Sequence, residues 1–278
     1  MQKMVITPHK SLWSIDWKEL WRYRDLVGMF IRRNIVVQYK QTIIGPLWYI
    51  VQPVLTVIMN MIVFGGIAKM STDGAPQILF YMVGNICWFY FADCLNQTST
   101  TFSANQRMFG KVYFPRLVVP IAVVVSNLLR FGIQFMLFVA IYGYFLFNSA
   151  EVHPNAALLL LPVLVVMTGG LGLGFGILVS SLTTKYRDLT ILFNFIVQLW
   201  MYATPIVYPL SMIGKRSLRT FIMINPMTSI VETFRYATLG QGYFSWALLA
   251  YSFIFMLLLL GFSIVIFNSV QRSFMDTI

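Results

Sequence analysis

Long apolar segments, separated by short polar stretches, predict that most of this chain crosses a membrane. Crossing ~30 Å of hydrocarbon takes about 20 predominantly apolar helical residues. Six segments supply that length nearly or fully, at residues 47–68, 78–96, 117–147, 156–181, 189–207 and 246–268. We interpret the third as one tilted helix, because two crossings would need about 40 residues. The expected fold is an all-α integral membrane protein with six transmembrane helices.

Composition and charge agree with this interpretation. Hydrophobic residues make up 58% of the 278 residues and charged residues only 10%, whereas soluble domains carry about 25% charged residues, so a soluble globular domain is excluded. The net charge of +11 would suit a nucleic-acid partner, but most Lys and Arg residues fall on one side of the predicted spans. The positive-inside rule explains that distribution without nucleic acid. It places both termini in the cytoplasm of a multi-pass protein of the cell (inner) membrane.

Outside the spans, the N-terminal region has the clearest pattern. The expected domains are a cytoplasmic N-terminal region, a transmembrane domain and a cytoplasmic tail, at residues 1–46, 47–268 and 269–278. Within the first, residues 16–38 have apolar positions at helical spacing with basic side chains beside them, which predicts an amphipathic helix along the membrane interface. Two interpretations stay open. The helix is an inert surface anchor, or its basic side chains bind an anionic lipid headgroup.

Two further regions between the spans favour short helices. Residues 97–116 end in mixed basic and aromatic residues, which favours a short helix presented to a protein partner and ended by Pro115, although a solvated connection has the same composition. Residues 205–245 hold two apolar segments of about 14 residues, which rise only ~21 Å and cannot cross. We expect two short re-entrant outer helices there, the second starting at Asn225 and Pro226.

Side chains suited to catalysis or metal binding are sparse. Neither histidine has carboxylates or cysteines at metal-ligand spacing. The chain also lacks a P-loop, so we expect a non-catalytic subunit without a cofactor of its own. Glycines at 169, 170, 172, 174 and 176 lie inside a span, where they favour close helix packing over phosphate binding. Asp93 and Arg130 are either a functional relay or a neutralised pair, and we favour a structural pair or interfacial snorkelling of the two side chains over a relay.

Aromatic and amide side chains are frequent within the predicted spans. Aromatic residues make up 16% of the chain, and aromatic faces stack well on sugar rings. Amides at membrane depth, such as Asn60 and Asn85, would be costly against lipid. These amides therefore face the protein interior, where they either line a wet cavity or join helices by hydrogen bonds.

Four motifs, in order and spacing, resemble the ABC-2 polysaccharide exporter permeases. These are VQYKQTIIGPLW followed by QP over residues 37–53, KYRDL over 185–189, ATPIVYP over 203–209, and NP-x5-E-x2-R over 225–235. The resemblance covers nearly the whole chain. Its family includes the membrane subunits that export O-antigen, capsular polysaccharide and teichoic acid, of the Wzm and TarG type.

The resemblance implies an assembly of several chains. Two permeases would form a homodimer around a channel, and two separate ABC nucleotide-binding subunits would dock from the cytoplasm and hydrolyse Mg-ATP. The substrate implied is an undecaprenyl-pyrophosphate-linked polysaccharide, most simply O-antigen. Alternatives are export of teichoic acid or capsular polysaccharide, export of drugs or small lipids, and, in a different class, a membrane enzyme that modifies glycans. The missing acid–base cluster disfavours the enzyme.

The resemblance also implies roles for particular residues. Those that would guide the anionic headgroup are Arg32, Arg33 and Lys40. Those that would couple to the ATPase are Arg107, Lys111, Tyr113 and Phe114, with a second contact at Arg187 and Asp188. The outer gate would comprise Pro205, Pro209, Asn225, Pro226, Glu232 and Arg235. From position alone, we add a glycan-channel lining of Trp88, Phe89, Tyr90, Trp200 and Tyr202.

Overall fold

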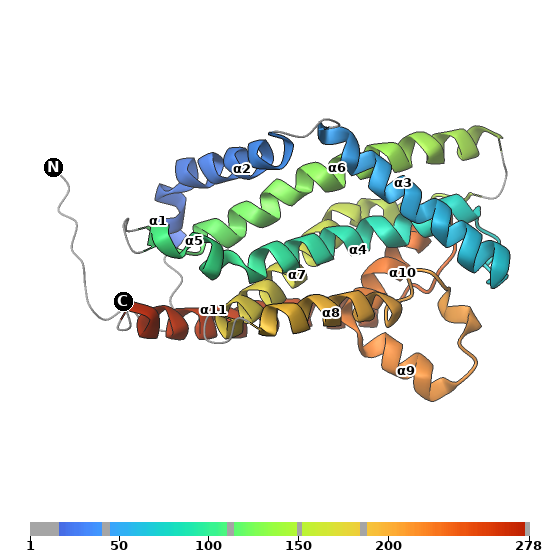
Figure 1. The fold of residues 1–278 in the computed structure, drawn as a ribbon. Coiled ribbons are helices and arrows are strands. Elements are labelled where there is room, and N and C mark those ends of the chain that lie inside the picture. Colours follow the sequence, from blue (N-terminus) through green and yellow to red (C-terminus); the bar gives the residue numbers. More distant parts are fainter. Residues whose placement is uncertain (1–16, 41–44, 110–113, 149–151, 184–187, 276–278) are drawn as a thin grey trace.

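Every regular element in the described part of the chain is helical. The computed structural model describes residues 17–40, 45–109, 114–148, 152–183 and 188–275 (Figure 1). Its α-helices are α1 (Trp17–Arg22), α2 (Arg24–Tyr39), α3 (Trp48–Asn60), α4 (Gln77–Ser99), α5 (Thr101–Phe109), α6 (Val118–Asn148), α7 (Leu161–Thr183), α8 (Leu189–Tyr202), α9 (Arg216–Ile224), α10 (Pro226–Leu239) and α11 (Trp246–Met275). Shorter helices are η1 (Gly45–Leu47), η2 (Met61–Ile67), η3 (Ala156–Leu160) and η4 (Leu210–Met212). Within these ranges the all-α prediction is confirmed.

Within the described residues, five helical segments are long and apolar enough to cross a membrane. They are Trp48–Ile67, Gln77–Ser99, Val118–Asn148, Ala156–Thr183 and Trp246–Val270. The continuous 31-residue α6 matches the single tilted helix predicted for the third span.

The segment predicted as the fifth span, residues 189–207, forms a shorter helix than expected. α8 has 14 residues and ends at Tyr202, so it rises only ~21 Å. Pro205 explains the early end, because proline disfavours helical geometry at the preceding residue and has no N–H to donate. The total of six crossings stays a prediction.

The N-terminal amphipathic helix, predicted as one piece, is divided in two. α1 ends at Arg22 and α2 begins at Arg24, with Tyr23 between them at φ −91° and ψ 17°. The apolar face of α2 packs against α6, and Phe30 is buried in that contact. Trp21 remains exposed. In Figure 1, α2 lies beside the first half of α6 at one end of the bundle.

Glycines in α7 let this helix approach two neighbours closely. A Cβ added at Gly172 would lie 2.6 Å from the Cβ of Cys94 on α4, and one added at Gly174 would lie 2.9 Å from the Cγ of Leu259 on α11. Both separations are far below van der Waals contact, so larger side chains would separate the helices. The helix-packing interpretation of these glycines is therefore confirmed. α4, which α7 packs against, is the central helix of the bundle (Figure 1).

An ion pair and hydrogen bonds also join the membrane helices. Arg130 on α6 forms an ion pair with Asp93 on α4, with Nη1 2.6 Å from Oδ2. Its Nη2 donates to the Oε1 of Gln52 on α3 at 3.1 Å. On α3 and α4, Asn60 donates through Nδ2 to the Oδ1 of Asn85 at 3.5 Å. The neutralised pair predicted for Asp93 and Arg130 is confirmed, and it ties three helices together.

Candidate functional sites

An open cleft between α2, α4, α5 and α6, named here the headgroup cleft, has a volume of about 590 Å³. Its lining comprises Arg33, Asn34, Val37, Gln97, Thr101, Ala104, Asn105, Val119 and Val123. The set contains one cation, three amides, one hydroxyl group and no carboxylate. Such a lining suits an anionic group with oxygen acceptors, because a guanidinium and amides all donate hydrogen bonds.

Arg33 is held at this cleft by three contacts, one of which is a hydrogen bond from its Nη2 to the Oδ1 of the neighbouring Asn34 at 3.4 Å. Its guanidinium carbon lies 4.6 Å from the ring centroid of the buried Phe30. Its Nη2 lies 3.5 Å from the Oδ1 of Asn105 on α5. The side chain is still exposed, so its charge is accessible to an anion. Arg32 and Lys40, predicted to act with it, are exposed on α2 and at its C-terminal end but do not line the cleft.

The short helix predicted within residues 97–116 is α5, described over Thr101–Phe109. Residues 110–113 lie outside the described residues, so its end at Pro115 stays a prediction. An aromatic cluster joins α5 to the rest of the protein. The Phe102 ring stacks on Phe267 of α11 with centroids 4.6 Å apart, and Phe109 lies 5.7 Å from Phe114. These side chains are almost fully buried, so the Phe102 ring connects α5 to α11, while α5 also packs against α7 and α4.

The predicted ATPase-coupling residues fall into different environments. Phe114 is 6% exposed and packs inside the protein, where a partner does not reach it. Asp188 is exposed and caps α8, its Oδ1 accepting from the Leu189 N–H at 3.1 Å. The side chain of Arg107, and all of Lys111, Tyr113 and Arg187, lie outside the described residues. The coupling role of these residues stays a prediction.

Glu232 and Arg235 form a buried ion pair on α10, with Arg235 Nη1 3.0 Å from Glu232 Oε1 and both side chains nearly inaccessible. The Arg235 guanidinium also donates to the Ile206 carbonyl and lies 3.7 Å from the ring centroid of Phe80. Glu232 Oε2 accepts from the Tyr243 N–H at 2.8 Å. Burial raises the pKa of the Glu232 carboxyl, and the neighbouring Arg235 charge opposes that rise.

The sequence analysis assigned this pair to the outer gate and did not predict that it is buried. Nearly every residue of α10 is buried, because the helix is enclosed by α4, α7, α9, α11 and η3. A helix surrounded on all sides has no polar face. A charged pair can occupy it only because each charge has partners within hydrogen-bonding distance.

The two motifs at 203–209 and 225–235 meet in space. Asn225 caps α10, its Oδ1 accepting from the Met227 N–H at 3.1 Å, as predicted. Its Nδ2 also donates to the Thr204 Oγ1 at 2.8 Å. Together with the bond from Arg235 to Ile206, this contact fixes α10 to the turn that follows α8. The prolines assigned to the gate, Pro205, Pro209 and Pro226, are all buried in this unit.

α11 contacts the same unit from another side. The Ser229 and Ser252 hydroxyl oxygens lie 2.7 Å apart, and Ser252 also donates to the Pro226 carbonyl at 3.0 Å. Tyr251 donates to the Ile224 carbonyl at the end of α9. α11 therefore contacts α5 near one end and α9 and α10 near the other.

The five aromatic side chains predicted to line a channel differ in exposure. Trp88 and Tyr90 are 3% and 4% exposed, whereas Tyr202 is 59% exposed; Phe89 and Trp200 are half-buried. Trp88 lies 6.4 Å from Trp200 between ring centroids, in an edge-on arrangement. Their role toward a glycan stays a prediction, and Trp88 and Tyr90 would meet a polymer only if the core around them opened.

A known protein family matches most of the chain that the structure describes. Residues 25–239 match the ABC-2 type transporter family. The chain belongs to that family. The matched region contains the headgroup cleft, α5 and the buried pair of this ABC-2 transporter, and ends at the last residue of α10.

Individual relatives of this ABC-2 transporter align over most of their length. It is 27% identical over 222 residues to the O-antigen export system permease protein RfbA of Myxococcus xanthus, covering 78% of this chain and 82% of the relative. It is 26% identical over 257 residues to RfbA of Klebsiella pneumoniae, covering 91% and 94%. The polysialic acid transport protein KpsM of Escherichia coli is 24% identical over 220 residues, covering 77% and 80%.

Some residues of this ABC-2 transporter that shape the sites were missed by the sequence analysis. Asn34 and Asn105 line the headgroup cleft from different helices, and neither belongs to a motif. Tyr243 contributes only a backbone N–H to Glu232, and Ile206 only a carbonyl. A backbone contribution leaves no trace in the side-chain pattern. Position beside Arg33 was the one available signal for Asn34.

Proposed function

We propose that this chain is the membrane permease subunit of an ABC transporter that exports a polysaccharide linked to undecaprenyl pyrophosphate, with O-antigen as the substrate. The observation that carries this proposal is the extent of similarity to proteins named O-antigen export permeases. One of them aligns over 91% of this chain and 94% of its own length. The family match over residues 25–239 also includes the headgroup cleft, α5 and the buried pair, so the likeness is not limited to a shared span pattern.

The headgroup cleft supports a lipid-linked anionic substrate. A pyrophosphate offers several oxygen acceptors, which suits the exposed guanidinium of Arg33 and the amides of Asn34, Gln97 and Asn105. The exposed Arg32 and Lys40 lie on the same helix and would raise the local concentration of anions. We assign the cleft as the place where the headgroup leaves the membrane surface.

An exposed apolar face supports a homodimer in the membrane. α8 carries large exposed apolar side chains, including Ile191 and Phe195. Two copies facing one another through this helix would enclose a path for the polymer. Both termini lie in the cytoplasm of the inner membrane in this proposal, and Mg-ATP is hydrolysed on two separate subunits that contact α5 and the Asp188 region.

The unit built from α9, α10 and the turn after α8 suits an outer gate. Arg235 holds three segments at once, since it contacts Glu232, Ile206 and Phe80. Because these contacts join the segments, we expect the unit to move as a rigid body. A gate that opens by rigid-body motion is therefore favoured, and a gate that opens by unfolding is not. Capsular polysaccharide is the second candidate substrate, because the relative KpsM is named for transport of polysialic acid. Teichoic acid remains a further alternative.

Charge reversal at Arg33 tests the proposal. In cells that lack the native gene, Arg33→Glu should strongly reduce surface polysaccharide while the ATPase still co-purifies with the permease. Arg24→Glu is the matched control, because Arg24 is an exposed arginine of the same helix outside the cleft. Normal surface polysaccharide in the Arg33→Glu strain would refute the role of the cleft. Immunoblots that separate O-antigen from capsule identify the polymer. If cells that lack the native gene lose neither polymer, the proposed function is refuted.

A further inference from the structure

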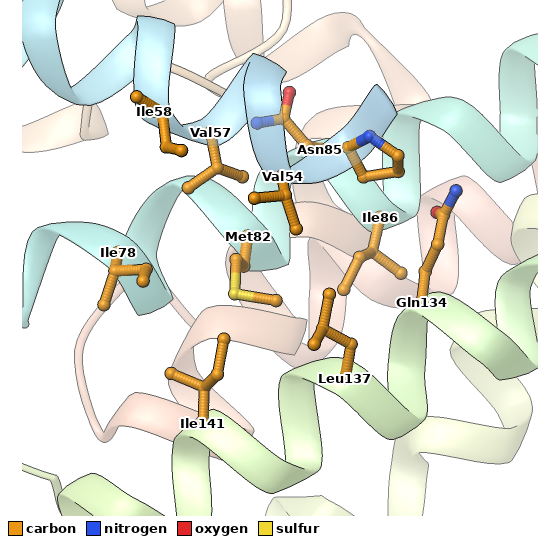
Figure 2. Close-up of a pocket in the computed structure, with 11 residues that line it drawn as sticks. Val54, Val57, Ile58, Ile78, Met82, Asn85, Ile86, Gln134, Leu137 and Ile141 are labelled. Atoms are coloured by element: carbon orange, nitrogen blue, oxygen red, sulfur yellow. The ribbon is translucent and has the colours of Figure 1, made fainter. Parts of the chain in front are cut away.

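A second cavity lies between α3, α4 and α6, apart from the headgroup cleft. Its volume is about 110 Å³. Figure 2 shows Val54, Met82 and Leu137, one from each helix, pointing toward one another across it. We name it the three-helix cavity. Its size compares with that of an engineered apolar cavity of roughly 150 Å³ that stays dry and takes up benzene or xenon.

The surface of the three-helix cavity is entirely apolar. Two amides, Asn85 and Gln134, are among its lining residues, but Figure 2 shows both amide groups turned away from the centre. Water, sugars and ions need polar partners, which this surface does not offer. The chemistry of the lining therefore selects a hydrocarbon.

Lining residues that are not fully buried indicate where the cavity opens. Ile58 on α3 is 44% exposed and Ile141 on α6 is half-buried, so we infer an opening beside these two helices. The neighbouring side chains Leu55 and Met59 are 54% and 56% exposed. All three helices are candidate membrane spans. A cavity that opens on an apolar face within such spans is accessible to lipid chains and not to water.

We infer that the three-helix cavity is a binding site for a hydrocarbon chain of a membrane lipid, which inserts between α3 and α6. An acyl chain of bulk phospholipid and the prenyl chain of a lipid-linked substrate share the required chemistry. The inference does not depend on which polymer the protein exports. A chain lodged there fills space that is otherwise empty between three spans, and it thereby stabilises their packing.

Photo-crosslinking tests this site in the full chain reconstituted in lipid nanodiscs. The probe is a phospholipid with a diazirine inside one acyl chain, and labelled residues are located by peptide mass spectrometry. Met82 and Ile86 are 5% and 2% exposed, so lipid outside the cavity does not reach them, whereas Leu258 on α11 is 69% exposed and reports bulk lipid. We expect labelling at Met82 and Ile86 as well as at Leu258.

Filling the cavity should reduce the labelling of Met82 and Ile86. Val54→Phe should reduce labelling of Met82 and Ile86 relative to Leu258 by at least about fivefold, because the added ring leaves no room for a chain. Leu55→Phe adds the same ring beside it on an exposed position and should leave the labelling unchanged. Ile141→Phe fills the cavity from α6 and provides a second variant if Val54→Phe does not fold.

Two outcomes would overturn the inference. One is a wild-type protein labelled at Leu258 but not at Met82 or Ile86. This outcome includes the case in which a second copy of the chain covers the cavity, so that Ile58 is crosslinked to that copy and not to lipid. The other is labelling of Met82 and Ile86 that persists in both cavity-filled variants. A polyprenyl phosphate with the same diazirine, used in parallel, distinguishes the two lipid sources. Neither readout requires export, so failure here is distinct from failure of the proposed function.

Discussion

Replacing Glu232 by alanine removes one half of the ion pair inside α10 and leaves Arg235 charged and buried. Removing one partner of a buried pair typically destabilises a protein by about 3–5 kcal/mol. Arg235 would keep the Ile206 carbonyl and the Phe80 ring, and a desolvated cation–π contact contributes up to about 2 kcal/mol. The Tyr243 N–H would lose its acceptor, but Tyr243 is 43% exposed, so water can replace the carboxylate and this loss adds little. We therefore expect a net loss of about 3–5 kcal/mol.

The loss is measurable as a lower unfolding temperature of the purified protein. At about 2–4 °C per kcal/mol for proteins of 150–250 residues, the midpoint should fall by ~6–20 °C. Asp25→Ala is the matched control, because its pair with Arg24 is exposed, with an N–O distance of 3.8 Å and side chains 65% and 94% accessible. An exposed pair contributes at most about 1 kcal/mol.

A double variant separates charge from packing. Glu232→Gln with Arg235→Met removes both charges and retains similar volume, so it should be more stable than Glu232→Ala alone. If Glu232→Ala shifts the midpoint no more than Asp25→Ala does, the pair does not hold α10 in the way described. A double variant less stable than the single variant would show that side-chain shape, and not the unpaired charge, determines the loss.

Three other substitutions test the remaining contacts. Gly172→Leu should reduce the folded fraction in size-exclusion profiles, because an added Cβ would lie 2.6 Å from Cys94 Cβ. Gly143→Leu should be tolerated, because its added Cβ would have no neighbour within 4 Å. Equal size-exclusion profiles for the two variants would contradict the packing argument. Asn225→Ala should lower stability by about 0.5–2 kcal/mol through loss of the N-cap, and Asn225→Asp, which keeps the acceptor, should lose less in the same thermal assay. Asp93→Asn should lower the unfolding temperature less than Glu232→Ala, because the pair with Arg130 is partly exposed, at 23% and 16%; an equal shift would contradict this ranking.

Sequence patterns predicted the features that depend on local composition. The span formed by α6 follows from an unbroken apolar run, and the start of α10 follows from Asn225 and Pro226, whose capping chemistry acts over three residues. The glycine packing in α7 was predictable because small residues inside a span have few other uses.

Features that depend on neighbours from distant parts of the chain were not predictable in the same way. The burial of Glu232 depends on the helices that surround α10, and a helical projection of one segment does not contain them. Phe114 was assigned to a partner surface, although Phe109 and Phe30 cover it inside the protein. The headgroup cleft combines side chains from four helices, of which only Arg33 had been selected in advance.

The two sets of contacts on α11 have a mechanical consequence. Phe267 stacks on α5, and Ser252 is bonded to the first turn of α10. These positions are 15 residues apart on one uninterrupted helix, a separation of ~22 Å along its axis. An α-helix resists stretching and compression over such a length, so α11 forms a stiff connection between the two contacts. α7 packs along α11 and also contacts both α5 and α10, so a displacement of α5 would reach α10 through these two helices together.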